Sequence, residues 1–435
     1  MHLPINLQKP LFVLTLMCTA VTHAQQADPM AANPRNYRHY LGIVVQQHPS
    51  VLAAQNQIES ARQDVEGAKW QFMPTPSIGA EKSNKSADGF TDRRTTFARL
   101  QQPLWTGGRL TAQLDKAQAQ ETIASLTLAE QRLTLAQRWL QLWAETQAAE
   151  LKVQAYADSE EQHRKYVQQV QNRAKEGQAP RSDTQLSLTR LAAVQAELEQ
   201  ANAQKRQAIS RLEQMYGGPL PVSAIRWTAS LPNQISTNGT LLRPVSDWIT
   251  QIQDQHPSLQ KAAAVTRTVQ ADVEISKAKT YPELYLRGEI LDGDVSKHNR
   301  QIYVGMTSSF GAGLSNLSTI AAAQAKLDAQ AHETETRRRD IAEQVQADVQ
   351  SLESQTQRLQ YLEQAYASAQ EYLQASERQF AAGRKSWQEL MNTAREKAQT
   401  LAQLADAKSL HWLAQQRLNL LSMGVDTYLN GNANP

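Results

Sequence analysis

The sequence predicts a mainly α-helical chain, internally duplicated, in which long coiled-coil-like helices are combined with four short β-strands. Three observations support this fold class. His48-Pro49-Ser50 recurs as His256-Pro257-Ser258, 208 positions later. Long stretches place apolar residues seven positions apart, which is the spacing of coiled-coil helices. Each half also holds two short segments with strand-like alternation, separated by turn residues.

The repeat has the size of a whole structural half. A period near 207 residues is far longer than the roughly 20 to 50 residues of a solenoid unit. It divides the chain into a first repeat, 25–218, a linker, 219–244, a second repeat, 245–424, and a C-terminal tail, 425–435. Matching positions include Pro74 with Pro282, Gly177 with Gly383, and Gly217 with Gly424.

The N-terminal segment 1–24 is typical of a cleaved secretory signal peptide. Lys9 precedes the apolar run from Leu11 to Ala20, and Ala24 ends a small-residue cleavage site. The run is shorter than the about 20 apolar residues that a membrane-spanning helix needs. The single cysteine, Cys18, lies inside this segment, so disulfide and thiol chemistry are not expected in the mature chain.

Each repeat is expected to begin with a helical segment, Tyr37 to Phe72 and Val245 to Tyr281. Pro74 and Pro282 end these segments, because proline cannot continue a helix. A β-hairpin follows each proline, at about 75–104 and about 283–310. From Leu284 to Ile290 the apolar residues take every second place, and the first half is less regular.

The expected strands have about the length that a tilted strand needs to cross a membrane. Alternation alone fits an ordinary hairpin with one wet face equally well.

Long helical hairpins, 109–216 and 317–422, complete the repeats. From Arg109 to Glu176 there is neither proline nor glycine, which predicts a rod of about 100 Å. Two heptad series, from Leu126 to Leu140 and from Leu128 to Leu142, lie on opposite sides of this helix. We therefore expect neighbours on both sides, as in a wall, rather than the single seam of a two-stranded coiled coil. A plain antiparallel bundle is the alternative.

Composition and motifs favour neither nucleic-acid binding nor catalysis. The formal net charge is +3, which gives no electrostatic case for nucleic acid. The nine histidines are scattered without a His-Glu-x-x-His motif, and Gly107-Gly108-Arg109 lacks the Lys-Ser/Thr of a phosphate loop. His48 and His256 are expected at helix ends. We predict no enzyme activity, metal or cofactor, with a hydrolase carrying an unrecognised site as a disfavoured alternative.

Four strands cannot close a membrane barrel, which needs about eight. If the strands span a membrane, several chains must share one barrel, because an open edge would leave backbone groups unpaired in lipid. Two copies would supply eight strands and three would supply twelve. The residues alone do not choose between these numbers.

The ordered set of motifs resembles the TolC family of outer-membrane channels over about Tyr37 to Gly424. The resemblance rests on the duplication, on the two hairpins and on the run from Gln102 to Arg109, Q-P-L-W-T-G-G-R, which leads into a long Ala/Gln-rich helix. The residues that form this barrel–helix junction are Pro74, Pro103, Trp105, Gly107, Gly108, Arg109 and Pro282.

The resemblance implies a homotrimer with a shared twelve-stranded barrel in the outer membrane, continued by a twelve-helix periplasmic tunnel. The expected partners are a periplasmic adaptor protein and an inner-membrane transporter. Chain length, the junction sequence and the lack of a lipid-attachment site favour type I protein secretion through an ABC exporter. The alternatives are a tripartite drug-efflux pump and, outside the channel class, a periplasmic coiled-coil scaffold whose strands form a small sandwich.

The family resemblance also implies that Gly177 and Gly383 are the turns of the periplasmic tips, where the tunnel closes. The positions that match the family's acidic constriction are Glu389 and Asn392, so one carboxylate ring is expected instead of two. Because Gln185 is the nearest counterpart of Glu389, the charge of the gate is assigned to the second half.

A polar latch between the tips is implied at Ser182, Asp183, Phe380 and Lys385. Lys385 is expected to pair with Asp183, and Phe380 lacks the hydroxyl group typical of its position. The alternative is that these residues are solvated helix-end charges, with Ser182 or Asp183 as an N-cap.

Overall fold

The two halves of the chain form the same series of helices and strands. The computed structural model describes residues 37–83, 93–220, 243–293, 299–308 and 315–430. The signal segment 1–24, nearly all of the linker and Phe310 lie outside these residues. The elements are α1 (Tyr37–Gln47), α2 (Pro49–Trp70), β1 (Thr75–Ser83), β2 (Arg93–Trp105), α3 (Arg109–Lys175), α4 (Arg181–Tyr216), α6 (Val245–Gln255), α7 (Pro257–Ala278), β3 (Glu283–Gly293), β4 (Asn299–Thr307), α8 (Ser315–Ala381), α9 (Trp387–Met423) and α10 (Val425–Asn430).

The duplicated His-Pro-Ser motif breaks each approach segment into two helices, where a single helix was expected. His48 is the N-cap of α2, and its Nδ1 accepts a hydrogen bond from the Ser50 amide at 3.3 Å. His256 caps α7 in the same way, at 3.2 Å from the Ser258 amide. The proline that follows each histidine occupies the first helical turn, where its missing N–H costs nothing. The prediction that both histidines are helix-end residues is confirmed.

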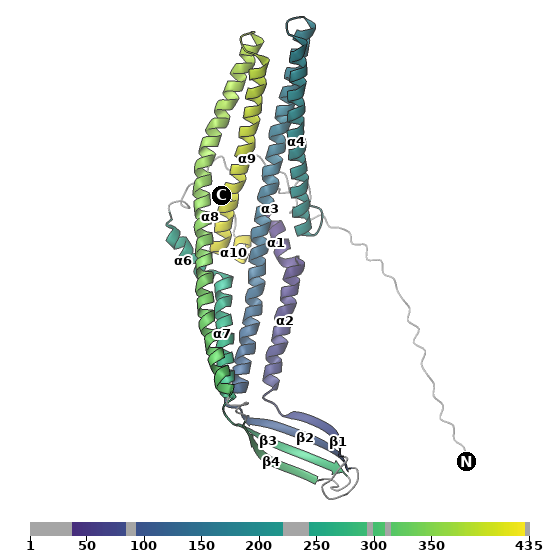
Figure 1. The fold of residues 1–435 in the computed structure, drawn as a ribbon, viewed down its shortest axis with the longest axis vertical. Helices are drawn as coiled ribbons and strands as arrows, with labels where there is room; N and C mark the ends of the chain where they lie inside the picture. Colours follow the sequence, from purple (N-terminus) through teal and green to yellow (C-terminus); the bar gives the residue numbers. More distant parts are fainter. Residues whose placement is uncertain (1–36, 84–92, 221–242, 294–298, 309–314, 431–435) are drawn as a thin grey trace, which may run out of the picture.

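The long helices form a wall (Figure 1). Near the sheet α3 lies between α2 and α7, and farther away it lies between α4 and α9, while α8 packs on α7 and then on α9. Leu133 and Leu140 of one heptad series and Leu135 and Leu142 of the other are all buried. The prediction of neighbours on both sides of α3 is confirmed. At 67 residues, α3 is about 100 Å long.

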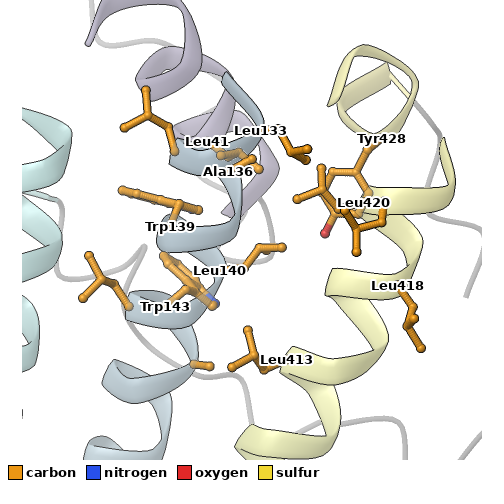
Figure 2. Packing of buried hydrophobic residues seen from close by; sticks show 14 of the residues in the cluster. Leu41, Leu133, Ala136, Trp139, Leu140, Trp143, Leu413, Leu418, Leu420 and Tyr428 are labelled. Carbon is orange, nitrogen blue, oxygen red and sulfur yellow. The ribbon is translucent and has the colours of Figure 1, made fainter. Parts of the chain in front are cut away.

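The largest apolar core lies at mid-height, where the short helices α1, α6 and α10 pack against the wall (Figure 1). Figure 2 shows the part of this core between α3, α9 and α10. Trp139 and Trp143 of α3 stack with ring centroids 6.1 Å apart. Tyr428 of α10 is fully buried in the same core, beside Leu420 (Figure 2). Residues 425–430, expected to be part of a tail, therefore form a packed helix.

The four strands form one antiparallel sheet in the order β1-β2-β3-β4. The two hairpins are joined by the β2–β3 pairing, in which Ala98 lies opposite Ile290. The order places β1 and β4 at the two edges. The sandwich expected for a scaffold protein is wrong, because all four strands belong to a single layer.

Candidate functional site

The sheet has one mainly apolar face, with Arg300 at the start of β4 opposite Ile290, and one polar face. Pairing register puts Ile78, Leu100, Ile290, Ile302 and Val304 on the same face. All five are exposed in the single chain, Ile78 at 88% and Ile302 at 81%. A continuous apolar surface of this kind marks contact with lipid or with another protein.

The opposite face carries a hydrogen-bonded polar ladder. Arg99 Nη2 donates to Glu289 Oε1 at 2.7 Å, and the Tyr303 hydroxyl donates to Glu289 Oε2 at 3.2 Å. Arg287 donates to the Tyr303 hydroxyl at 2.9 Å and to Gln101 Oε1 at 2.7 Å. The alternation from Leu284 to Ile290 correctly predicted that Arg287 and Glu289 lie opposite the apolar residues. It missed Arg99, because the alternation of the first hairpin is irregular.

At the junction between sheet and helices, two glycines turn the chain sharply. Gly107 and Gly108 have φ values of +61° and +89°, in the left-handed region. A Cβ on Gly107 would lie 2.8 Å from Cβ of Tyr281, so a side chain does not fit there. Trp105, at a register irregularity that follows Pro103, packs edge-on against Tyr281 at 6.2 Å.

Arg109, the first residue of α3, fixes the long helix to the sheet. Its Nε and Nη2 donate to the two carboxylate oxygens of Glu283 at 2.6 and 3.2 Å, a bidentate geometry that orients both groups. Glu283 begins β3 directly after Pro282, and Pro74 likewise precedes β1. Glu283 was not predicted, because its partner lies in the other half of the chain.

The two tips have the same backbone design. Gly177 and Gly383 both have φ +72°, and Pro180 and Ser386 are the N-caps of the following helices. Asp183 and Glu389 are therefore equivalent, each three residues after the cap. The assignment of Gln185 as the counterpart of Glu389 is wrong, as is an N-cap at Ser182 or Asp183. Each half thus supplies a carboxylate, and that of Glu389 forms a capping box with Ser386.

The expected Lys385–Asp183 pair is not formed within the chain. Lys385 Nζ donates to the Tyr372 hydroxyl at 2.9 Å and to Ser376 Oγ at 2.8 Å, both on the neighbouring α8. Ser182 is exposed, and Phe380 is a buried member of the apolar cluster at the tips.

Other residues connect the tips of the two repeats. Tyr166 donates its hydroxyl to Glu377 Oε1 at 2.5 Å, and Arg173 donates to the Phe380 carbonyl at 3.0 Å. Arg190 of α4 donates to Oδ1 of Asn392 on α9 at 2.5 Å. Sequence reasoning missed these donors, because nothing in the sequence states which helix faces lie opposite each other.

His163 of α3 is buried close to these contacts, with 1% of its surface exposed. Its Nδ1 lies 2.8 Å from the Ser159 carbonyl oxygen, and the ring also hydrogen-bonds the backbone of Met391 on α9. Burial lowers the pKa of His163 below its usual value, and Arg190 and Arg395 lower this pKa further, against the opposing effect of the two backbone hydrogen bonds.

The lowered pKa of His163 makes the fold less stable in acid. A base with a depressed folded-state pKa binds fewer protons in the folded than in the unfolded state, so stability falls as pH drops through the unfolded value of about 6.5. Thermal unfolding at about pH 7.5 and about pH 5.5 should show a smaller acid-induced drop in Tm for His163→Gln than for the wild type. The exposed His332→Gln is the control, and an equal drop in all three proteins would contradict the prediction.

Neither a membrane-spanning helix nor a metal-binding cluster is found among the described residues. None of the helices in these parts of the chain is both long enough and apolar enough to cross a membrane. Within the same residues, His, Cys, Asp and Glu side chains form no group of three or more that is arranged to hold a metal ion.

Comparison with known proteins identifies the family. The family described as "Outer membrane efflux protein" matches residues 41–218 and 248–422, most of both repeats. No curated protein matches.

Several solved structures share the fold. The CmeC outer membrane channel of Campylobacter jejuni has a TM-score of 0.77 at 10% identity, over 97% of this chain and 94% of its own. The outer membrane protein VceC of Vibrio cholerae has a TM-score of 0.74 at 16% identity, over 89% and 95%. The MtrE outer membrane channel of Neisseria gonorrhoeae has a TM-score of 0.71 at 16% identity, over 90% and 89%.

The family match confirms the resemblance to TolC-type channels. It excludes the periplasmic scaffold alternative, because a scaffold of that kind would lie outside the membrane. The chain belongs to the outer membrane efflux protein family, and it is a non-enzymatic outer-membrane channel with a periplasmic helical extension.

Proposed function

We propose that three copies of the chain close into a single duct, with a twelve-stranded barrel and a twelve-helix tunnel. The observation that carries this proposal is that the chain forms an open wall whose two edges are made of different helices. Helix α8 forms one edge, and α2 and α4 form the other. Among the described residues, the outer sides of β1 and β4 pair with no strand.

Unlike edges favour closure into a ring. Contact between one edge and the other edge of the next copy is heterologous, and such contacts make a closed ring when the rotation between copies matches. In lipid, the unpaired backbone groups of β1 and β4 would each cost several kcal/mol. Twelve strands leave room for a lumen, whereas eight strands fill the interior with side chains.

The proposed duct is the outer-membrane exit of a tripartite exporter. It works with a periplasmic adaptor and an inner-membrane transporter. We infer type I protein secretion with an ABC exporter from the chain length and the Trp105 to Arg109 junction sequence. A tripartite small-molecule efflux pump is the second candidate, because the matched family is described as efflux proteins.

Deletion of the gene distinguishes the two kinds of cargo. For secretion we expect a protein to disappear from the medium and accumulate in cells, while sensitivity to small toxic compounds stays unchanged. For efflux the reverse is expected. Restoration by the wild-type gene controls for indirect effects. Absence of the protein from the outer-membrane fraction would contradict the duct itself.

We further propose that Glu389 and Asn392 lie at the tip constriction, closed by the Arg190–Asn392 contact. Removal of a hydrogen bond to a charged group shifts an equilibrium by about 1.5 kcal/mol, or roughly tenfold. Arg190→Ala should therefore raise the open fraction in planar bilayers by about tenfold. Lys385→Ala, which loses contacts only with its own helical hairpin, should change it much less. Equal effects, or unchanged conductance in Arg190→Ala, would exclude this latch.

A further inference from the structure

Positive charge is concentrated at the two helical tips. Residues 167–193 and 373–399, equivalent segments around Gly177 and Gly383, contain nine basic and five acidic residues. The rest of the chain contains 36 basic and 37 acidic residues, since the totals are 45 and 42. The tips therefore carry +4 per chain, and all other residues together carry −1.

Three of the nine basic side chains of the tips are held by neutral partners. Arg173 lies over the Phe380 ring at 4.1 Å and bonds the Phe380 carbonyl. Lys385 lies over the Tyr372 ring at 4.2 Å and bonds two hydroxyl groups. Arg190 bonds the Asn392 amide oxygen, and its buried Nε has no hydrogen-bond partner within the described residues.

These contacts hold the three cations in place without neutralising them. Among the described residues, no Lys or Arg of the two tip segments lies within ion-pair distance of a carboxylate. Two of the five acidic residues are hydrogen-bonded to neutral groups instead of to a tip cation. Glu377 accepts a hydrogen bond from the Tyr166 hydroxyl, and Glu389 forms the capping box of α9 with Ser386. The excess positive charge is thus left to act on ions and solutes outside the chain.

We propose that the periplasmic mouth of the duct prefers anions and that its cargo is anionic, with exposed carboxylate or phosphate groups. This inference rests on the proposed closure of three copies, which brings three pairs of tips, each pair with a net charge of +4, to one opening. Charges at a narrow mouth raise the local concentration of counter-ions within about a Debye length, about 8 Å at physiological salt. Three pairs of positively charged tips around one aperture satisfy this condition, and the Glu389 carboxylates proposed at the constriction are already included in their net charge.

The reversal potential of the purified oligomer in planar bilayers, under a KCl gradient, tests the proposal. We expect chloride to permeate about fivefold better than potassium, because a mouth potential near one kT raises anion concentration and lowers cation concentration by similar factors. The double variant Arg181→Glu, Arg384→Glu removes the net charge of the tip at two exposed positions. It should abolish the preference for chloride.

A matched variant keeps the charge change but moves it to the other end of the tunnel. Lys69→Glu with Lys279→Glu alters two exposed lysines beside the sheet, and should leave the chloride preference intact. Cation preference in the wild type, or equal loss in both double variants, would overturn the proposal. The proposal would also be overturned if the tip variant stopped export but kept the ion selectivity of the wild type. The positive charge would then be needed to bind a partner protein and not to select ions. Absence of any conductance would instead count against the duct.

Discussion

Ile302→Arg is expected to prevent the chain from assembling in the outer membrane. Ile302 is 81% exposed on the apolar sheet face and lies opposite Gly288, the middle residue of β3. An arginine on the lipid side of a membrane strand costs about 2–4 kcal/mol at the midplane. In the proposed three-copy duct the cost is about 6–12 kcal/mol. Heat-resistant oligomer in the outer-membrane fraction, measured by gel electrophoresis, should be lost.

Gln301→Arg is the matched control for this prediction. Gln301 is the neighbouring residue on β4, and its register places it on the polar face beside Glu289. The same side chain is there exposed to water instead of lipid, so assembly should be retained. If both variants assembled equally well, the apolar face would not be the lipid-facing surface of the sheet.

Tyr428→Ala is expected to produce the largest loss of fold stability, about 3–5 kcal/mol, as for other large aromatic residues in cores. Tyr428 is fully buried in the mid-height core. Its hydroxyl lies 2.9 Å from that of Tyr37 and donates to Gln416 Oε1 at 2.7 Å. The side chain thus joins the last helix, α10, to the first helix, α1, and to α9.

Tyr428→Phe separates packing from hydrogen bonding in the same core. It keeps the ring, and the Tyr37 hydroxyl still donates to Gln416 at 2.9 Å, so the expected loss is about 1 kcal/mol. Denaturant unfolding of the detergent-solubilised protein measures both variants. Equal losses of unfolding free energy in the two variants would show that Tyr428 stabilises the fold through its hydroxyl group and not through the burial of its ring.

Helix and strand positions were largely predictable, because each follows from a local signal. The rod that begins at Arg109 follows from the lack of proline and glycine, and its two-sided burial follows from the heptad series ending at Leu140 and Leu142. The second hairpin was clearer than the first, since its apolar residues alternate strictly. His48 was expected at a helix end, but the division of the segment into α1 and α2 was missed, because the His48 side-chain cap that starts the second helix is seen only in the folded chain.

The tips show where sequence reasoning failed. A shift of two residues in matching the halves made Gln185 the counterpart of Glu389, whereas the N-caps make Asp183 the equivalent residue. Lys385 was expected to bond across to Asp183 but bonds to its own hairpin. Both errors arise because the orientation of a side chain at a helix end depends on the exact residue at which the helix begins.

The sequence alone determined the duplication, the elements of each repeat and the alternation that separates an apolar from a polar sheet face. These depend on spacing along the chain, which is visible in one dimension. The tertiary structure alone decided which strands and helices meet: β2 with β3, Arg109 with Glu283, Arg190 with Asn392, and α10 with α1. Such contacts join residues far apart in sequence, and many partners satisfy the same apolar or charge pattern, so only packing in three dimensions selects among them.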